Sequence, residues 1–376
     1  MSELASYSIQ AIFFALVAVV VVSRSKKTDL YQFALISIWL CGVIAIYARY
    51  GEDQVLFYSN DQQFHRDVIE YYLTVEGIQV RELISLRYLL TVPVYFVSLL
   101  GFNAMLIIKF LQLSALLLVY KRSQQFLSEQ SMQIRFWQLP LIAGPILMFM
   151  SLLSLRDVIL AYFALLFVTS NDYKNKVIGL GGAFLLRPHL GVALAFGFIL
   201  SILYSRWKPK FQSITLAVAA VVSYGLGTIA YWIGAVIQKG ASFDTPRAVF
   251  SQFKFSQLAA NFFGLQFLAL NDPEKAIVDA STFALLLSRL VFFDTLLIPM
   301  LFLIAIFRHP EFLTKQKVLT FHAFMFFYGV VSQTSYNSTR QNIPFLACMG
   351  LLAVADIEHF RKIKAKVAPK LLMATR

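Results

Sequence analysis

The sequence predicts an all-α polytopic membrane protein, and two observations lead to this prediction. Of the 376 residues, 59% are hydrophobic and only 14% are charged, with 36 phenylalanines and a mean hydropathy of +0.68. Apolar runs of about 15 to 25 residues also recur along the chain, and about 20 residues in a helix cross the hydrocarbon layer of a bilayer. This pattern excludes an ordinary soluble core, and an outer-membrane barrel would show short alternating segments instead.

The basic residues predict how the apolar runs cross the membrane. They fall in clusters between the runs, and the positive-inside rule assigns such clusters to the cytoplasmic side. Alternation between the two sides then gives about eleven transmembrane helices, with the N-terminus outside and the C-terminus in the cytoplasm. The predicted spans cover residues 8–22, 31–48, 103–120, 137–153, 157–170, 177–187, 189–204, 212–235, 282–306, 318–333 and 343–356.

Charge and cysteine content exclude other classes of protein. The net charge of +13 comes largely from bases in the predicted cytoplasmic clusters, so it marks topology and we expect no nucleic-acid partner. Cys41 and Cys348 lie in separate apolar runs, so neither a disulfide framework nor a thiolate metal site is expected. Bases follow the run 8–22 rather than precede it, so we expect a retained helix and not a cleaved signal sequence.

Residues 86–101 do not fit the alternation if they cross the membrane. They contain Pro93 and Arg87, and we expect a helix that lies along the outer surface. The whole chain, 1–376, is then one transmembrane domain with outer segments at about 49–102 and 236–281 and a basic cytoplasmic tail at 361–376.

The stretch AFLLRPHLGV, residues 183–192, predicts a short helical hairpin. A single helix over 177–204 would be about 42 Å long and would begin and end at cytoplasmic bases, which one crossing cannot do. Pro188 interrupts a regular helix, so two short helices should meet at Arg187 and His189 near the outer side. Irregular backbone at this depth is tolerated where it is buried in protein or lines a wet cavity. Both side chains are therefore candidates for the floor of such a cavity.

The two predicted sides differ in their kind of base. Thirteen of the twenty inner bases are lysine, whereas eight of the eleven outer bases are arginine. Lysine suffices as a topological anchor, but the planar guanidinium suits bidentate recognition of phosphate or carboxylate. These arginines either pair with the acids of the outer loops or contribute to an anion site. The outer set is Arg49, Arg66, Arg81, Arg87, Arg156, Arg187, Arg247 and Arg340.

The first outer loop carries titratable side chains in close succession. In SNDQQFHRDVIEYY, Asp61 and His65 would share one face of a helix, and Asp67 follows two residues later. These groups are candidates for taking a proton from a hydroxyl. Two other interpretations stay open: Asp61 caps a short surface helix, or the three side chains bind a metal.

The stretch SLLSLRDVILAYF, residues 151–163, predicts a helix start. Ser154 and Asp157 have the spacing of a capping box, which gives Asp157 a structural role at the helix amides. Arg156 has no such role, and a helix N-terminus beside it adds N–H donors suited to phosphate.

The stretch SQTSYNSTRQNIPFLA, residues 332–347, predicts another outer turn. Asn342 and Pro344 mark the start of the last helix, and Arg340 lies two residues before Asn342. Within the preceding apolar region, Arg289 and Asp294 are five residues apart and face different directions, so each should have a partner on another helix.

The order of these features resembles the EpsG and Wzy-type membrane polymerases of bacterial cell-surface polysaccharides. The resemblance rests on the outer loop SNDQQFHRDVIEYY, the segment RYLLTVPVYFVSLLG, the helix start SLRD, the hairpin LRPH and the turn STRQNIPFL. It implies a GT-C-like architecture in the bacterial inner membrane. It also implies transfer of glycan from an undecaprenyl-diphosphate-linked donor to a lipid-linked acceptor at the outer face, extending an O-antigen, capsule or exopolysaccharide.

The resemblance also implies roles for the residues found above. The arginines would neutralise the leaving diphosphate, with no metal and no cofactor required. The implied partners are the undecaprenyl-diphosphate-linked oligosaccharide, the lipid bilayer and a chain-length regulator protein. Candidate catalytic residues are Asp61, His65 and Asp67, and candidate diphosphate-binding residues are Arg156, Arg187, His189, Arg289 and Arg340.

Two other functions fit the same pattern. A transporter or flippase of lipid-linked sugars or other anions would also use a re-entrant hairpin and buried charges. The absence of a detectable internal repeat and the gathering of polar groups at one face favour the enzyme. An O-antigen ligase or single-sugar transferase on this architecture has the same sequence signature.

Overall fold

The structure, a computed structural model, consists of α-helices throughout the part of the chain that it describes. The described residues are 2–24, 30–51, 66, 69, 90–132, 135–153, 156–207, 212–239, 294, 296–307, 313–331 and 342–374.

Six of the described helices are long and apolar enough to cross a membrane. The eleven spans that the sequence predicts remain a prediction, because other predicted spans coincide with shorter helices. Three of these are α9 (Asp157–Thr169), α10 (Tyr173–Leu186) and α16 (Lys315–Val331). The six long helices are α1 (Glu3–Ser23), α2 (Leu30–Tyr50), α6 (Ala104–Glu129), α11 (Pro188–Trp207), α12 (Gln212–Lys239) and α18 (Ile343–Ala374).

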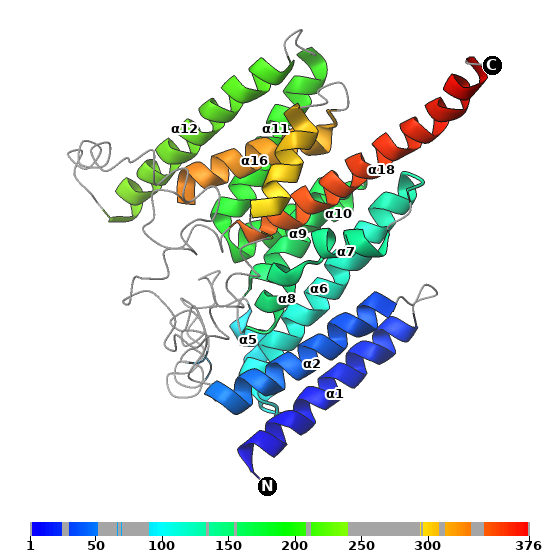
Figure 1. The fold of residues 1–376 in the computed structure, drawn as a ribbon. Coiled ribbons are helices and arrows are strands. Elements are labelled where there is room, and N and C mark those ends of the chain that lie inside the picture. Colours follow the sequence, from blue (N-terminus) through cyan, green and yellow to red (C-terminus); the bar gives the residue numbers. More distant parts are fainter. Residues whose placement is uncertain are drawn as a thin grey trace.

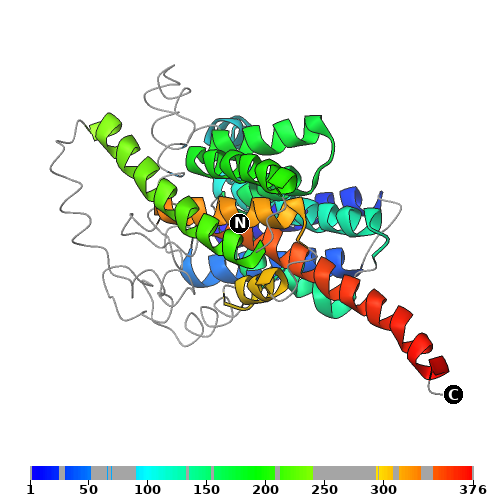
Figure 2. The ribbon, with the colours of Figure 1, turned by 90° about the horizontal axis from the view of Figure 1, so that it is seen from above.

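Helix α9 lies at the centre of the bundle. It packs against α6, α10 and α18, while α1 and α2 pair with each other on one side (Figure 1). On the other side, α16 packs between α11 and α12, and α12 lies at the edge of the bundle in both views (Figure 2). Short helix α9 is therefore shielded by longer ones, which explains why it can carry polar groups at its ends.

Glycines allow the helices around α16 to touch through their backbones. A Cβ added at Gly227 of α12 would lie 2.0 Å from the carbonyl oxygen of Phe326, and one at Gly329 would lie 2.1 Å from that of Tyr224. Such close contacts of small residues are a main source of helix association in membranes.

The predicted span 137–153 is wrong as a single helix. It divides into a 3-10 turn (Phe136–Gln138), α7 (Leu139–Ile142) and α8 (Pro145–Ser151). Proline at the start of α8 removes an amide donor, and at Gly144 a Cβ would lie 2.1 Å from the Pro140 carbonyl oxygen. The chain therefore turns sharply at Gly144.

This break frees backbone groups inside the bundle, and side chains from distant helices satisfy them. The Tyr31 hydroxyl donates to the Ala143 carbonyl at 3.0 Å, and the Ile146 amide donates to Asp294 Oδ2 at 2.9 Å. Asp294 is buried, and this contact is the partner on another helix that the sequence led us to expect. Broken membrane helices are tolerated where neighbours supply such bonds.

One end of the bundle gathers basic side chains from several helices, and we call it the basic end. Arg122 of α6 donates to the hydroxyl and the carbonyl of Thr169, at 2.9 and 2.8 Å, and so fixes the end of α9. Buried Lys317 pairs with Asp356 of α18. These bases belong to the clusters from which the sequence predicts one common side.

Further contacts at the basic end involve α18. Gln138 Nε2 donates to Glu358 Oε1 at 2.7 Å, and Arg135 lies 3.8 Å from the same oxygen. Helix α18 continues to Ala374, so the tail that the sequence places at 361–376 is helical over most of its length.

The opposite end holds the starts of α1 and α6. Asn103 caps α6 by accepting from the Leu106 amide at 2.8 Å, and its own amide donates to Gln10 Oε1 of α1 at 2.7 Å. The segment predicted to lie along the surface contains the short helix α5 (Thr91–Ser98), which packs against α6. Residues 86–89 of that segment lie outside the described residues.

Candidate functional site

A side chain of α6 binds a backbone amide at the start of α9. Helix α9 begins at Asp157, three residues after the predicted cap Ser154, which lies outside the described residues. The buried side chain of Gln112 accepts a hydrogen bond from the Val158 amide at 2.9 Å and so satisfies one of the free amides at this helix start. Because Ser154 is not among the described residues, the capping box of Ser154 and Asp157 stays a prediction.

The Asp157 carboxylate binds Arg187. Arg187 Nη2 lies 3.2 Å from Asp157 Oδ1, and both residues are buried, at 8% and 0% exposed. A buried carboxylate is stable only when its charge is paired. The pair joins two turns that are thirty residues apart in the chain.

The turn that carries Arg187 is the hairpin that the sequence predicts. Helix α10 ends at Leu186 and α11 begins at Pro188, with Arg187 between them in an extended backbone conformation. Proline is well suited to the first position of a helix because it has no amide to leave unsatisfied. His189 lies in the first turn of α11 and is exposed on the surface of the protein.

Arg156 makes a second connection between the same two turns. Its Nη1 donates to the carbonyl of Leu186 at 2.7 Å, so it satisfies an acceptor at the end of α10. Arg156 thus binds Leu186, and the next residue, Asp157, binds Arg187. The sequence predicts that Arg156 and Arg187 share one side of the membrane, and the structure places them in one cluster.

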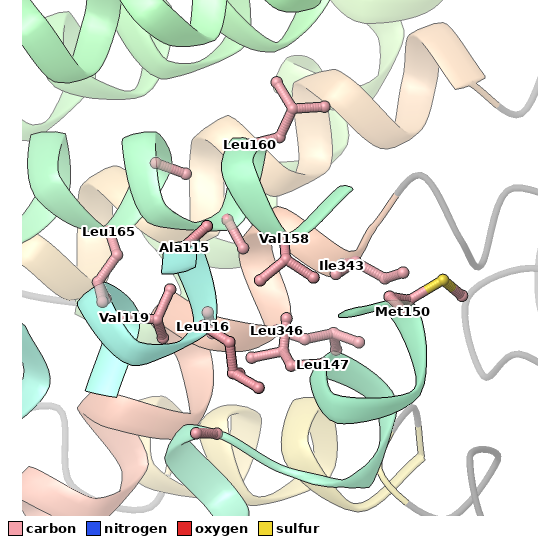
Figure 3. Close-up of a cluster of buried hydrophobic side chains, with 14 of the residues drawn as sticks. Ala115, Leu116, Val119, Leu147, Met150, Val158, Leu160, Leu165, Ile343 and Leu346 are labelled. Atoms are coloured by element: carbon pink, nitrogen blue, oxygen red, sulfur yellow. The ribbon is translucent and has the colours of Figure 1, made fainter. Parts of the chain in front are cut away.

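A third turn reaches this region at the start of α18. Asn342 precedes the helix and is buried, and the next residue, Ile343, packs in one cluster with Val158 of α9 (Figure 3). The helix start that the sequence predicts at Asn342 and Pro344 is confirmed. Arg340 precedes Asn342 by two residues and lies outside the described residues.

These residues form a recessed group that we call the polar cluster. Gln112 is nine residues beyond the cap Asn103, which corresponds to about 13 Å along α6. Helices α9 and α10 are about 20 Å long, whereas the hydrocarbon layer is about 30 Å thick. The cluster therefore lies within the apolar bundle, away from the basic end. Its members are Gln112, Arg156, Asp157 and Arg187, and Asn342 lies at the neighbouring start of α18.

Several predicted site residues fall outside the part of the chain that the structure describes: Asp61, His65, Asp67, Arg289 and Arg340. Of the neighbours of the first three, Arg66 is half-buried and Ile69 belongs to the buried apolar core. The alternative of a metal at Asp61, His65 and Asp67 likewise falls outside; within the described ranges, no three His, Cys, Asp or Glu side chains form a metal-binding group.

The sequence gives a signal for two polar side chains that were not among the predicted site residues. Gln112 is an uncharged polar residue inside the apolar run 103–120, and a buried amide of this kind normally has a hydrogen-bond partner. Lys109, one turn earlier on α6, is also buried and donates to the Tyr7 hydroxyl at 3.2 Å.

A Ser–His pair elsewhere in the bundle has a structural role. Ser223 Oγ and His322 Nδ1 lie 3.0 Å apart between α12 and α16, and both residues are buried. The serine hydroxyl also lies 2.7 Å from the Ala219 carbonyl of its own helix. The pair thus links α12 to α16, and the direction of its hydrogen bond depends on the tautomer of His322.

The fold and the polar cluster define a class: an all-α membrane protein with arginines held at recessed turns. Comparison with known proteins adds no relative, since no family model, no curated protein and no solved structure matches the chain. The starts of α9 and α18 both point to the region of the cluster, and helix N-termini favour anions. The helix starts and the guanidinium groups thus bring several N–H donors to one region of the bundle.

Proposed function

We propose that this protein is a membrane glycosyltransferase that polymerises a bacterial cell-surface polysaccharide. It takes glycan from an undecaprenyl-diphosphate-linked donor and adds it to a lipid-linked acceptor. The observation that carries the proposal is the polar cluster, in which Arg156 and Arg187 each bond to the turn that carries the other, inside an apolar bundle. A lipid-linked diphosphate has the charge and the apolar tail that this environment would bind.

The distribution of bases supports an orientation for this activity. Lysine and arginine gather at the basic end, which we assign to the cytoplasm together with the C-terminus. The polar cluster then faces the outer side of the inner membrane, as does the N-terminus. On this side lipid-linked repeats would be joined after they have crossed the membrane.

The transfer replaces one C–O bond with another. A hydroxyl oxygen of the acceptor attacks the anomeric carbon of the donor sugar, the bond from that carbon to the diphosphate breaks, and undecaprenyl diphosphate leaves with the electron pair. The hydroxyl proton goes to a base among Asp61, His65 and Asp67. Arginine side chains stabilise the charge that develops on the diphosphate oxygens, with Arg156 and Arg187 as the central pair and His189, Arg289 and Arg340 as further contacts.

The contacts of the two central arginines support preorganisation. One nitrogen of Arg187 is held by Asp157, and one nitrogen of Arg156 is held by the Leu186 carbonyl. Donors that are already oriented need no rearrangement when charge develops, which is the main advantage of an enzyme site over water.

The experiment that tests the proposal is polymer analysis in cells that express variants of the full chain. We expect Arg187→Ala and Arg340→Ala to abolish long polysaccharide while single repeats remain attached to the acceptor. Membrane extracts must show the same amount of folded protein for each variant, because Arg187 also has a structural contact. Polymer of normal length in the Arg187→Ala strain would contradict the proposal. Lipid-linked repeats that fail to cross the membrane at all would indicate a transporter instead.

A further inference from the structure

Asn342 stands at a helix start but does not cap the helix. An asparagine at this position normally accepts from the amide of the second or third helical residue. Here the second residue is Pro344, which has no amide, and the Phe345 amide donates to the Asn342 backbone carbonyl at 2.9 Å. Asn103 shows the usual arrangement at the start of α6, where Oδ1 accepts from the Leu106 amide at 2.8 Å.

The Asn342 side chain is consequently left with an unused acceptor. Asn342 is 5% exposed, and its Oδ1 is buried without a hydrogen-bond partner among the residues that the structure describes. A buried polar atom without a partner costs about 1–3 kcal/mol, so such an atom calls for an explanation. One explanation is a ligand that donates a hydrogen bond.

The location of this acceptor indicates which ligand group would meet it. Asn342 lies at the start of α18, where Ile343 packs with Val158, one residue beyond the Asp157 that holds Arg187 (Figure 3). The diphosphate that links the lipid to its sugar is fully ionised at pH 7, so it offers acceptors to the arginines and has no proton to donate to Oδ1. A sugar hydroxyl can, and the sugar is attached directly to the diphosphate.

We propose that Asn342 Oδ1 accepts a hydrogen bond from a hydroxyl of the sugar next to the diphosphate, so that Asn342 is a specificity-determining residue of the site. This inference rests on the proposed function, because it takes the ligand to be a sugar-bearing lipid diphosphate. In this arrangement the arginines bind the diphosphate that all such lipids share, and Asn342 distinguishes lipids that carry a suitable sugar.

The test compares two ligands on the purified full-length protein in lipid nanodiscs. The first is undecaprenyl diphosphate, and the second is the undecaprenyl-diphosphate-linked repeat from the organism's own polysaccharide. We expect the wild type to bind the sugar-bearing lipid more tightly than the bare lipid. The variant Asn342→Leu should lose about three- to ten-fold in affinity for the sugar-bearing lipid and nothing for the bare one. Its thermal stability without ligand should be equal or higher, because leucine removes the unsatisfied oxygen.

Two further variants separate a ligand contact from a packing effect. Gln32→Leu is the matched control, since Gln32 Oε1 is also buried without a partner but belongs to the start of α2, away from the cluster. It should change neither affinity. Asn342→Asp keeps an acceptor oxygen but adds a negative charge. The charge should lower the affinity for both lipids, whereas the preference for the sugar-bearing lipid should remain.

The outcomes separate this inference from the proposed function. If Asn342→Leu keeps the full preference for the sugar-bearing lipid, or if a folded Asn342→Asp loses it, the role of Asn342 is wrong while the diphosphate site stands. If the wild type binds neither lipid, the proposed function itself fails, and the role of Asn342 fails with it.

Discussion

Arg187 Nη2 lies 3.2 Å from Asp157 Oδ1, and this buried contact joins the first residue of α9 to the tip of the α10–α11 hairpin. Both side chains are nearly inaccessible, so neither can lose its partner without leaving a charge in an apolar environment. The pair thus determines where the hairpin tip sits, and with it the position of every group that the tip carries.

The first prediction concerns the stability of this pair. Arg187→Leu and Asp157→Leu should each destabilise the protein by about 3–5 kcal/mol, because each leaves one buried charge alone. The double variant should recover most of this loss, since two apolar side chains pack without an uncompensated charge. Thermal unfolding in detergent, followed by size-exclusion chromatography, measures the difference. Losses that simply add in the double variant would show that the two side chains do not interact.

The second prediction uses the same double variant to separate stability from activity. With Arg187 and Asp157 both replaced by leucine, the protein should be folded but should make no long polymer, because the central cation is gone. Arg187→Lys keeps the charge without the planar fork and should retain only part of the activity. Full polymer length in the folded double variant would exclude Arg187 from the site.

The third prediction concerns a close contact between α9 and α10. A Cβ at Gly179 would lie 2.7 Å from the Phe167 amide nitrogen, whereas a Cβ at Gly181 would have no atom within 4 Å. Gly179→Ala should therefore push α10 away from α9 and lower the melting temperature. Activity should also fall, because α10 ends at Leu186, which binds Arg156 of the polar cluster. Gly181→Ala is the control and should behave as the wild type does. Equal behaviour of the two variants would contradict the packing described here.

The fourth prediction makes the same comparison on α12. Gly227→Ala places a methyl group against the Phe326 carbonyl oxygen, and Gly225→Ala places it in open space. We expect the former to lose about 1–3 kcal/mol of stability and the latter to lose little. Chromatographic yield after a heat step is a sufficient readout. A heat-labile Gly225→Ala protein would show that α12 has further neighbours on that face.

The fifth prediction tests the orientation in the membrane. In a background with Cys41 replaced by alanine, Glu3→Cys should react with a membrane-impermeant maleimide in intact spheroplasts. Gln130→Cys, exposed at the basic end, should react after permeabilisation alone. The native Cys348 is buried and should stay unlabelled. The reverse pattern would place the polar cluster on the cytoplasmic side and remove the basis for outer-face polymerisation.

Local chemistry made part of this fold predictable from the sequence. Pro188 and the bases at both ends of 177–204 predict the hairpin, and Asn342 with Pro344 predicts the start of α18; both agree with the structure. Each of these signals lies within a few residues of the feature that it marks. That is why they can be read without knowledge of the neighbours.

The contacts between distant segments could not be predicted in this way. The capping-box spacing of Ser154 and Asp157 predicts a helix start near these residues, but it does not predict the contacts of Asp157 with Arg187 and of Val158 with Gln112. The division of 137–153 into α7 and α8 likewise depends on Tyr31 and Asp294, which satisfy the freed backbone groups. Sequence spacing alone gives no information on such partners.

The measurement that tests the central claim most directly is polymer formation by the purified protein. The full chain, reconstituted in liposomes with the undecaprenyl-diphosphate-linked repeat of its own organism, is incubated and the glycans are separated by length on a gel. We predict a ladder of repeats for the wild type and single repeats for the folded Asp157→Leu/Arg187→Leu variant. A folded wild-type protein that leaves the repeats unextended, or a variant that produces the same ladder, would contradict the assignment of the polar cluster to polysaccharide polymerisation.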